Sequence, residues 1–125
     1  MDEKAGIEIT GSDTAAVVTF KDSSISDVGV IAAASSQIKE FINRAHPNRL
    51  IFDFGGVKFF SSQVLGLLLD IRATLENYNG EVMISAINPQ LHRVFKITNL
   101  DKIFRFFPDM ESAVKAARTG RVAFD

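Results

Sequence analysis

Short apolar segments and longer segments with helical spacing alternate along most of this chain, and this alternation limits the folds that it can adopt. Two parallel strands need a long crossover connection between them, and a helix usually supplies it. The alternation therefore predicts an α/β domain with a mainly parallel sheet of about four or five strands and about four helices packed on it. The functional residues of such sheets usually lie in the loops at the carboxyl ends of the strands. Here those loops are expected at residues 22–26, 55–63 and 87–89.

The N-terminal part departs from this alternation because two strand-like segments follow each other directly. Residues 6–10 alternate weakly, and residues 15–20 are apolar and rich in β-branched side chains. A turn-rich cluster at residues 11–14 separates them. Since so short a connection joins antiparallel strands, we expect an antiparallel hairpin at the start of the sheet.

Hydrophobic spacing, caps and turn residues predict the remaining elements. We expect Ser24 and Asp27 to form an approximate capping box before the first helix. Asn88 and Asp109 are expected to cap the third and fourth helices, and Met110 to share one face of the fourth with Ala113, Val114 and Ala117. The helices are expected over residues 26–44, 61–78, 89–98 and 109–117, and further strands over 50–54, 81–87 and 103–107.

The composition excludes several classes of function. Lys and Arg number 14 against 15 Asp and Glu, so the formal net charge is −1 and no global field attracts nucleic acid or an anionic membrane. The absence of cysteine excludes disulfides, thiolate metal sites and cysteine nucleophiles. Two histidines, His46 and His92, leave little for metal or triad chemistry. We therefore expect no enzyme, no metal or other cofactor, and no nucleic-acid or membrane partner.

No targeting segment is visible. Residues 1–5 are charged, and the longest strongly apolar run, residues 64–69, is far shorter than a membrane span. A cytoplasmic location is therefore expected. The 125 residues fit one domain, with a core from about residue 6 to 117 and a frayed tail over 118–125.

The segment from Phe52 to Gln63 is the most informative, because a strand, a Gly-Gly loop and a serine pair lead into an apolar helix. One interpretation is structural, since serine is a preferred N-cap. The other is that one serine is a phosphorylation switch, because a helix N-terminus favours a phosphate and the phosphate adds nearly two negative charges. The local sequence does not choose between them.

A catalytic or ligand-binding alternative uses Asp53 and the loop Gly55-Gly56. Asp53 stands within an apolar strand, where such a residue more often faces solvent or caps a neighbouring backbone group. The glycines lack the Lys-Ser/Thr that ends a nucleotide-binding P-loop, and no Gly-x-Gly-x-x-Gly occurs. A deep polar pocket at this loop would favour the alternative.

The whole pattern resembles the STAS domain, the sulfate-transporter and anti-sigma-factor-antagonist family. Residues 50–68 are similar to the family's strand, loop and Asp-Ser-Ser/Thr-Gly-Leu-Gly helix start, with Leu65 and Gly66 matching directly. Residues 20–27 stand where the family has the loop before its first helix. Residues 80–82, 87–89 and 99–104 are similar to later segments of the family's pattern.

The resemblance implies a non-enzymatic regulatory protein. In the bacterial antagonists of this family, an anti-sigma factor that is a serine kinase phosphorylates a serine at the helix start and so breaks the complex, and a serine phosphatase resets it. The acceptor would be Ser62, with Ser61 as a competing acceptor because it replaces the motif's aspartate. A constitutive STAS interaction or scaffold module is the alternative. The expected partner-binding residues are Ser24, Asp27, Ser61, Ser62, Gln63, Val64 and Gly66.

Overall fold

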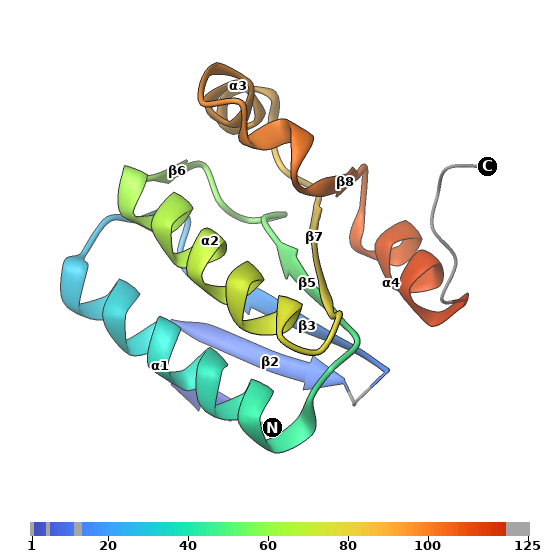
Figure 1. Cartoon of the computed structure of the whole chain (residues 1–125). Helices are drawn as coiled ribbons and strands as arrows, with labels where there is room; N and C mark the ends of the chain where they lie inside the picture. The colour runs from blue at the N-terminus through green and yellow to red at the C-terminus, as the bar shows by residue number, and fades with distance from the viewer. Residues whose placement is uncertain (1, 5, 12–13, 120–125) are drawn as a thin grey trace.

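The computed structural model describes residues 2–4, 6–11 and 14–119, and its main sheet has six strands in the order β1-β2-β3-β5-β7-β8 (Figure 1). The β3–β5, β5–β7 and β7–β8 pairs are parallel, so the predicted α/β class is confirmed. The β2–β3 pair is the predicted antiparallel hairpin, and β1 adds a strand that was not predicted. The strands are β1 Asp2–Lys4, β2 Ile7–Gly11, β3 Ala15–Phe20, β5 Arg49–Asp53, β7 Glu81–Ser85 and β8 Arg105–Phe107.

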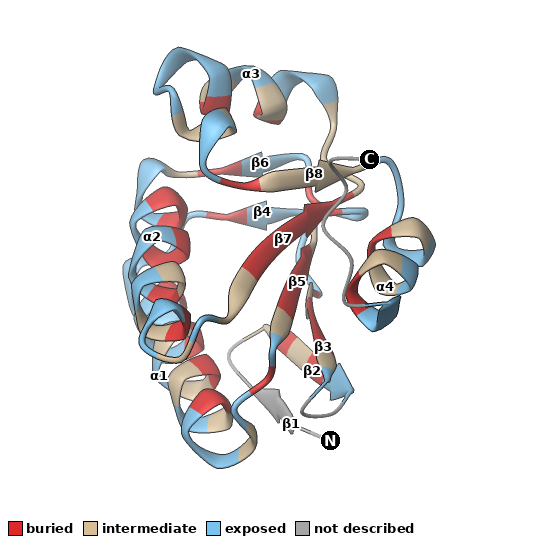
Figure 2. Ribbon diagram, turned by 45° about the vertical axis from the view of Figure 1, so that its right-hand side comes forward, coloured by how far each residue is buried: buried red, intermediate tan, exposed pale blue. Residues whose placement is uncertain are grey.

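Helices cover both faces of this sheet (Figure 2). Helices α1 and α2 pack side by side on one face, and α4 lies on the other. Helix α3 lies beyond the carboxyl ends of β5 and β7, followed by a short 3₁₀ helix, η1. No helix within the described residues is both long enough and apolar enough to span a membrane. The helices are α1 Val28–Ala45, α2 Ser62–Glu76, α3 Pro89–Ile97, η1 Leu100–Lys102 and α4 Met110–Thr119.

The central strands are apolar on both faces because both faces are covered. Along β5, Leu50 and Phe52 point into the larger core beneath α1 and α2, whereas Ile51 points into the smaller core beneath α4. Alternate residues of a strand face opposite sides of the sheet, so all three side chains are fully buried. This double burial explains the nearly continuous apolar run in the sequence.

The start of α1 differs from the prediction. Helix α1 begins at Val28, and the Asp27 side chain caps it by accepting a hydrogen bond from the Val30 N–H at 3.0 Å. Ser24 lies instead in a short strand, β4 (Ser24–Ile25), which pairs in parallel with β6 (Phe59–Phe60). The predicted capping role of Ser24 is therefore wrong. Strands of two residues leave no detectable periodicity in the sequence.

The buried face of the last helix also differs from the prediction. Met110 was expected on the buried face of the last helix, but 42% of its surface is exposed, while Ala113 and Ala117 are buried. Helix α4 approaches the sheet through these small alanines, so Met110, three residues before Ala113, stays at the rim.

Helix α4 continues to Thr119, so residues 118 and 119 are helical, and the rest of the predicted tail lies outside the described residues. The cap by Asp109 is confirmed, since its carboxylate accepts from the Ser112 N–H at 2.7 Å.

A continuous series of phenylalanine rings joins the sheet to α3. The ring centroids of Phe20 and Phe54 are 5.2 Å apart, and those of Phe54 and Phe60 are 5.7 Å apart. Phe60 meets Phe95 of α3 edge-on at 6.0 Å, and Phe95 meets Phe106 of β8 at 5.3 Å. Such aromatic pairs stabilise the core beyond the area that they bury. The rings therefore fix α3 over β6 and the end of the sheet.

Charged and phenolic side chains hold the opposite end of the sheet. The Glu81 carboxylate accepts a hydrogen bond from Arg105 Nε at 2.7 Å and lies 3.2 Å from Arg49 Nε. The Tyr78 hydroxyl donates to the Pro47 carbonyl at 2.9 Å, and partial burial raises the pKa of this phenol above its ordinary value of 10.0. These contacts are structural, and they leave Arg105 with a partner inside the fold.

The backbone of Ala86, directly after β7, provides a test of this fold. Its φ is +57°, a left-handed conformation that costs an alanine about 1–2 kcal/mol. Ala86→Gly relieves that cost but makes the unfolded chain more flexible, so we expect the free energy of unfolding to rise by about 0.5 kcal/mol. Urea denaturation measures it. Ala33→Gly, at an exposed position inside α1, is the control and is expected to cost about 1 kcal/mol. A destabilised Ala86→Gly protein would contradict this backbone conformation.

Candidate functional site

Two loops at the carboxyl end of the sheet are joined by backbone hydrogen bonds. The Ser23 carbonyl accepts from the N–H groups of Lys58 and Phe59 at 2.8 and 3.1 Å. The Ile25 carbonyl accepts from the Ser61 N–H at 3.0 Å. In Figure 2, β4 and β6 lie side by side beneath α3. The structure thus brings together the loop before α1 and the loop before α2, which are distant in the sequence and were both predicted to carry the site.

Asn88 attaches the third loop to the second. Its side-chain oxygen accepts from the Leu91 N–H at 2.9 Å, which confirms the predicted cap of α3. Its Nδ2 also donates to the Val57 carbonyl at 3.1 Å, a contact across the site that the sequence did not indicate. One amide therefore orders the start of α3 and the loop that precedes the serine pair.

The serine pair does not cap α2 in the expected way. Ser61 occupies the N-cap position with an extended backbone, but its side chain makes no capping hydrogen bond. Its hydroxyl lies 3.5 Å from Oε1 of Gln63, which is at most a weak contact. Ser62 is the first residue of α2 and is exposed, and the first turn holds no acidic residue. Capping therefore does not account for serine at these two positions.

Most of the predicted contact residues lie on the surface. Ser24, Asp27, Ser62, Gln63 and Gly66 are exposed, and Ser61 is half-buried. A side chain added at Gly66 would meet no atom within 4 Å, so the glycine leaves the α2 surface open instead of filling a packing need.

Val64 differs from the other predicted contact residues because it is buried. Its exposed fraction is 0%, because it lies on the buried stripe of α2 with Leu67 and Leu68 and packs in the main core. The Val64 side chain therefore cannot contact a partner on the surface.

Two exposed apolar residues at the site were missed. The Phe59 side chain is 53% exposed on β6, next in the chain to the buried Phe60, and Val28 is 61% exposed at the start of α1. Large apolar side chains lie mostly in the core, so residue type alone does not indicate that either residue is exposed. A strand register would have separated Phe59 from Phe60, but β6 is too short to show one.

Asp53 has a structural role at the end of β5. Its Oδ1 accepts hydrogen bonds from the Gly55 N–H at 3.1 Å and from the Ser85 hydroxyl at 3.3 Å. The carboxylate thus orders the turn after the strand. Among the described residues, no three His, Asp or Glu side chains are grouped to hold a metal ion.

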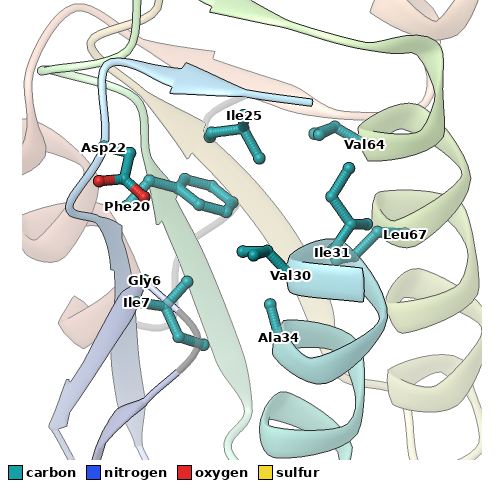
Figure 3. A pocket seen from close by; sticks show the side chains of 10 residues that line it. All are labelled: Gly6, Ile7, Phe20, Asp22, Ile25, Val30, Ile31, Ala34, Val64 and Leu67. Carbon is teal, nitrogen blue, oxygen red and sulfur yellow. The ribbon is translucent and has the colours of Figure 1, made fainter. Parts of the chain in front are cut away.

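An apolar hollow lies elsewhere, between the β2–β3 hairpin and the starts of α1 and α2 (Figure 3). Phe20, Ile31 and Val64 line it, with the Asp22 carboxylate at its edge. Neither Asp53 nor Gly55 nor Gly56 belongs to its lining. The hollow therefore gives no support to a ligand site at the glycine loop.

The comparisons with known proteins agree with this architecture. The model of the STAS domain family matches residues 7–113. The chain belongs to the STAS domain family. A protein of Thermotoga neapolitana named as an anti-sigma factor antagonist homolog is 26% identical over 76 residues, which span 61% of this chain and 66% of that relative. The match thus covers slightly less than two-thirds of the relative's length.

Solved structures show the same fold. The unphosphorylated anti-sigma factor antagonist SpoIIAA superposes with a TM-score of 0.80 at 20% identity, covering 93% of this chain and 98% of that one. The phosphorylated form of SpoIIAA from Bacillus gives 0.71 at 19% identity, with 90% and 99% covered. An anti-sigma factor antagonist of Mycobacterium paratuberculosis gives 0.71 at 25% identity, with 90% and 92% covered. This STAS domain therefore shares its fold with anti-sigma factor antagonists.

The two helix N-caps at the site give a second test. Because Ser61 makes no capping bond, we expect Ser61→Ala to change the free energy of unfolding by less than about 0.5 kcal/mol. Asp27→Ala removes a formed cap and is expected to cost about 1 kcal/mol, whereas Asp27→Asn keeps most of it. Thermal and urea denaturation measure all three variants. A Ser61→Ala loss as large as that of Asp27→Ala would show that serine does cap α2.

Proposed function

We propose that this protein is a non-enzymatic, cytoplasmic anti-sigma factor antagonist that binds an anti-sigma factor serine kinase and is switched by phosphorylation of Ser62. The observation that carries the proposal is the position of Ser62. It is exposed at the first residue of α2, beside the β4–β6 pair and on the same end of the molecule as Ser24 and Asp27. A serine phosphatase would reset the switch, and the output would be regulation of transcription.

The surface around Ser62 suits binding of another protein. It combines the exposed apolar side chains Phe59 and Val28 with exposed polar groups at Ser24 and Gln63. Interfaces commonly have an apolar centre and a polar rim. The β4–β6 pair and the Asn88 amide hold the loops in place, so little conformational entropy is lost on binding.

A phosphate on Ser62 would change this surface without unfolding the domain. The first turn of α2 carries no acidic residue, so the positive end of the helix favours the added anion. At an interface with a partner, however, the phosphate carries about −1.5 to −2 charges, so it either loses its hydration at a cost or repels the partner. The partner is released because its contacts change, while the fold stays intact.

The geometry favours Ser62 over Ser61 as acceptor. Ser61 is half-buried, and its N–H is bound to the Ile25 carbonyl. A kinase must reach the hydroxyl from several sides, which an exposed residue permits. Ser61 stays the competing acceptor.

Phosphorylation of the full chain tests the proposal. The protein is incubated with Mg-ATP and, in turn, each purified anti-sigma factor serine kinase of its source organism, and the modified peptide is mapped by mass spectrometry. We expect phosphate on Ser62 and none in Ser62→Ala. We also expect Ser62→Asp to weaken kinase binding by about tenfold or more in calorimetry, about 1.4 kcal/mol.

Ser36→Asp is the matched control, since Ser36 is exposed on α1 away from the loops that carry the site. It should bind like the unmodified protein. Absence of phosphate at Ser62, together with equal binding of Ser62→Asp and Ser62→Ala, would contradict the switch. Phosphate on Ser61 alone would contradict the assignment of the acceptor.

A constitutive STAS interaction module is the second candidate. It is favoured by the replacement of the motif's aspartate with Ser61 and by the exposed Phe59, which needs no charge change to bind a partner. Such a module would keep a partner bound in the Ser62→Asp variant and lose it in Phe59→Ser. The same calorimetric series therefore separates the two candidates.

A further inference from the structure

Helix α3 and the segment that follows it carry exposed isoleucines and exposed cations. Arg93, Lys96, Ile97, Lys102 and Ile103 are all exposed, and we name this set the α3–η1 surface. Ile97 is the most exposed of the large apolar side chains described, at 73%, and Ile103 is 37% exposed. None of these residues belongs to the proposed Ser62 site.

The geometry of α3 places Arg93 and Ile97 on the same outward face of the helix. Leu91 and Phe95 hold α3 against the core, and Ile97 lies two residues beyond Phe95, which is about 200° further round the helix. Arg93 lies four residues before Ile97 and therefore occupies the same face. The chain then turns at Asn99, whose φ is +64°, and η1 packs back against α3.

Arg93, Lys96 and Lys102 form no ion pair with any residue that the structure describes. Arg105, the next cation in the chain, is different because Glu81 binds it. The nearest carboxylate in the sequence is the half-buried Asp101, which offsets at most one of the three exposed cations, so the net charge of the surface is positive.

Stabilisation of the fold explains only part of this surface. A cation in the last turn of a helix interacts favourably with its dipole, which accounts for Lys96. It does not account for Ile97, since an isoleucine with most of its surface in water contributes little to the core. A protruding apolar side chain among cations matches the centre and rim of a protein interface.

We propose that the α3–η1 surface docks an acidic segment of a second protein, with Ile97 inserting into an apolar pocket whose rim carries Asp or Glu. Charge complementarity selects this occupant. A membrane is disfavoured because two isoleucines bury too little apolar area for stable anchoring. Single-stranded nucleic acid is disfavoured because isoleucine offers no ring on which a base can stack. The proposal does not depend on the switch at Ser62.

The test uses a synthetic helical peptide of about 15 residues with leucines along one face and glutamates beside them. Binding to the full chain is followed by changes in backbone amide NMR shifts. We expect these changes at residues 93–103, and we expect affinity to fall as salt is raised from about 50 to 300 mM. The same peptide with lysine in place of glutamate should not bind.

Ile97→Ser/Lys96→Glu should weaken binding of the acidic peptide by about tenfold or more. The melting temperature should fall by only a few degrees, because both side chains are exposed and only the favourable interaction of Lys96 with the helix dipole is lost. Met110→Ser/Lys115→Glu, the same chemical change on α4, is the matched control and should bind within about twofold of the unmodified protein. Equal binding of the lysine peptide would overturn the proposal, as would equal loss in both variants. Binding to vesicles of anionic phosphatidylglycerol without binding to the acidic peptide would also overturn it.

Discussion

The hydrogen bonds between β4 and β6 are the constraint on which the site depends. Each strand has two residues, and each follows a long strand of the main sheet. Their pairing closes the loops after β3 and β5 on each other, so that α1 and α2 start at the same end of the sheet (Figure 1). Without this pairing, Ser24 and Ser62 would belong to two independent loops. The small sheet therefore converts two sequence segments into one surface.

The phenylalanine rings extend that constraint to α3. The Phe60 ring contacts Phe54, which directly follows β5, and Phe95 of α3, so one side chain of β6 links the core to the helix above it. The surface around Ser62 and the α3–η1 surface therefore lie on elements that the same aromatic core holds together. Close-packed interiors leave little room for independent movement of such elements.

The sequence predicts the main architecture well because long elements carry strong periodic signals. The α2 helix and β5 are visible from hydrophobic spacing, and the caps at Asn88 and Asp109 from residue type. Prediction fails where an element is too short to have a period. The sequence predicts a capping role for Ser24 because β4, with two residues, shows no strand pattern, and for the same reason it does not predict the exposure of Phe59 on β6.

The site was predicted less completely than the fold. Motif spacing located Ser62, but it did not show that Val64 turns inward, because the whole first half of α2 is apolar and several faces are equally plausible from the sequence. Nor does a sequence show whether a serine at a helix start forms its cap. That depends on the orientation of the hydroxyl, and here the Ser61 hydroxyl makes no capping bond while the Ser61 N–H is bound to the Ile25 carbonyl.

Gly66 has a consequence for the choice of partner. It lies one helical turn after Ser62, on the outer side of α2, and it leaves bare backbone where most helices carry a side chain. A binding element can approach the helix axis more closely there than at any residue with a Cβ. Shape, as well as charge, therefore distinguishes partners at this site: a bulky residue at position 66 would reject a closely packed helix and leave the fold and the serine unchanged.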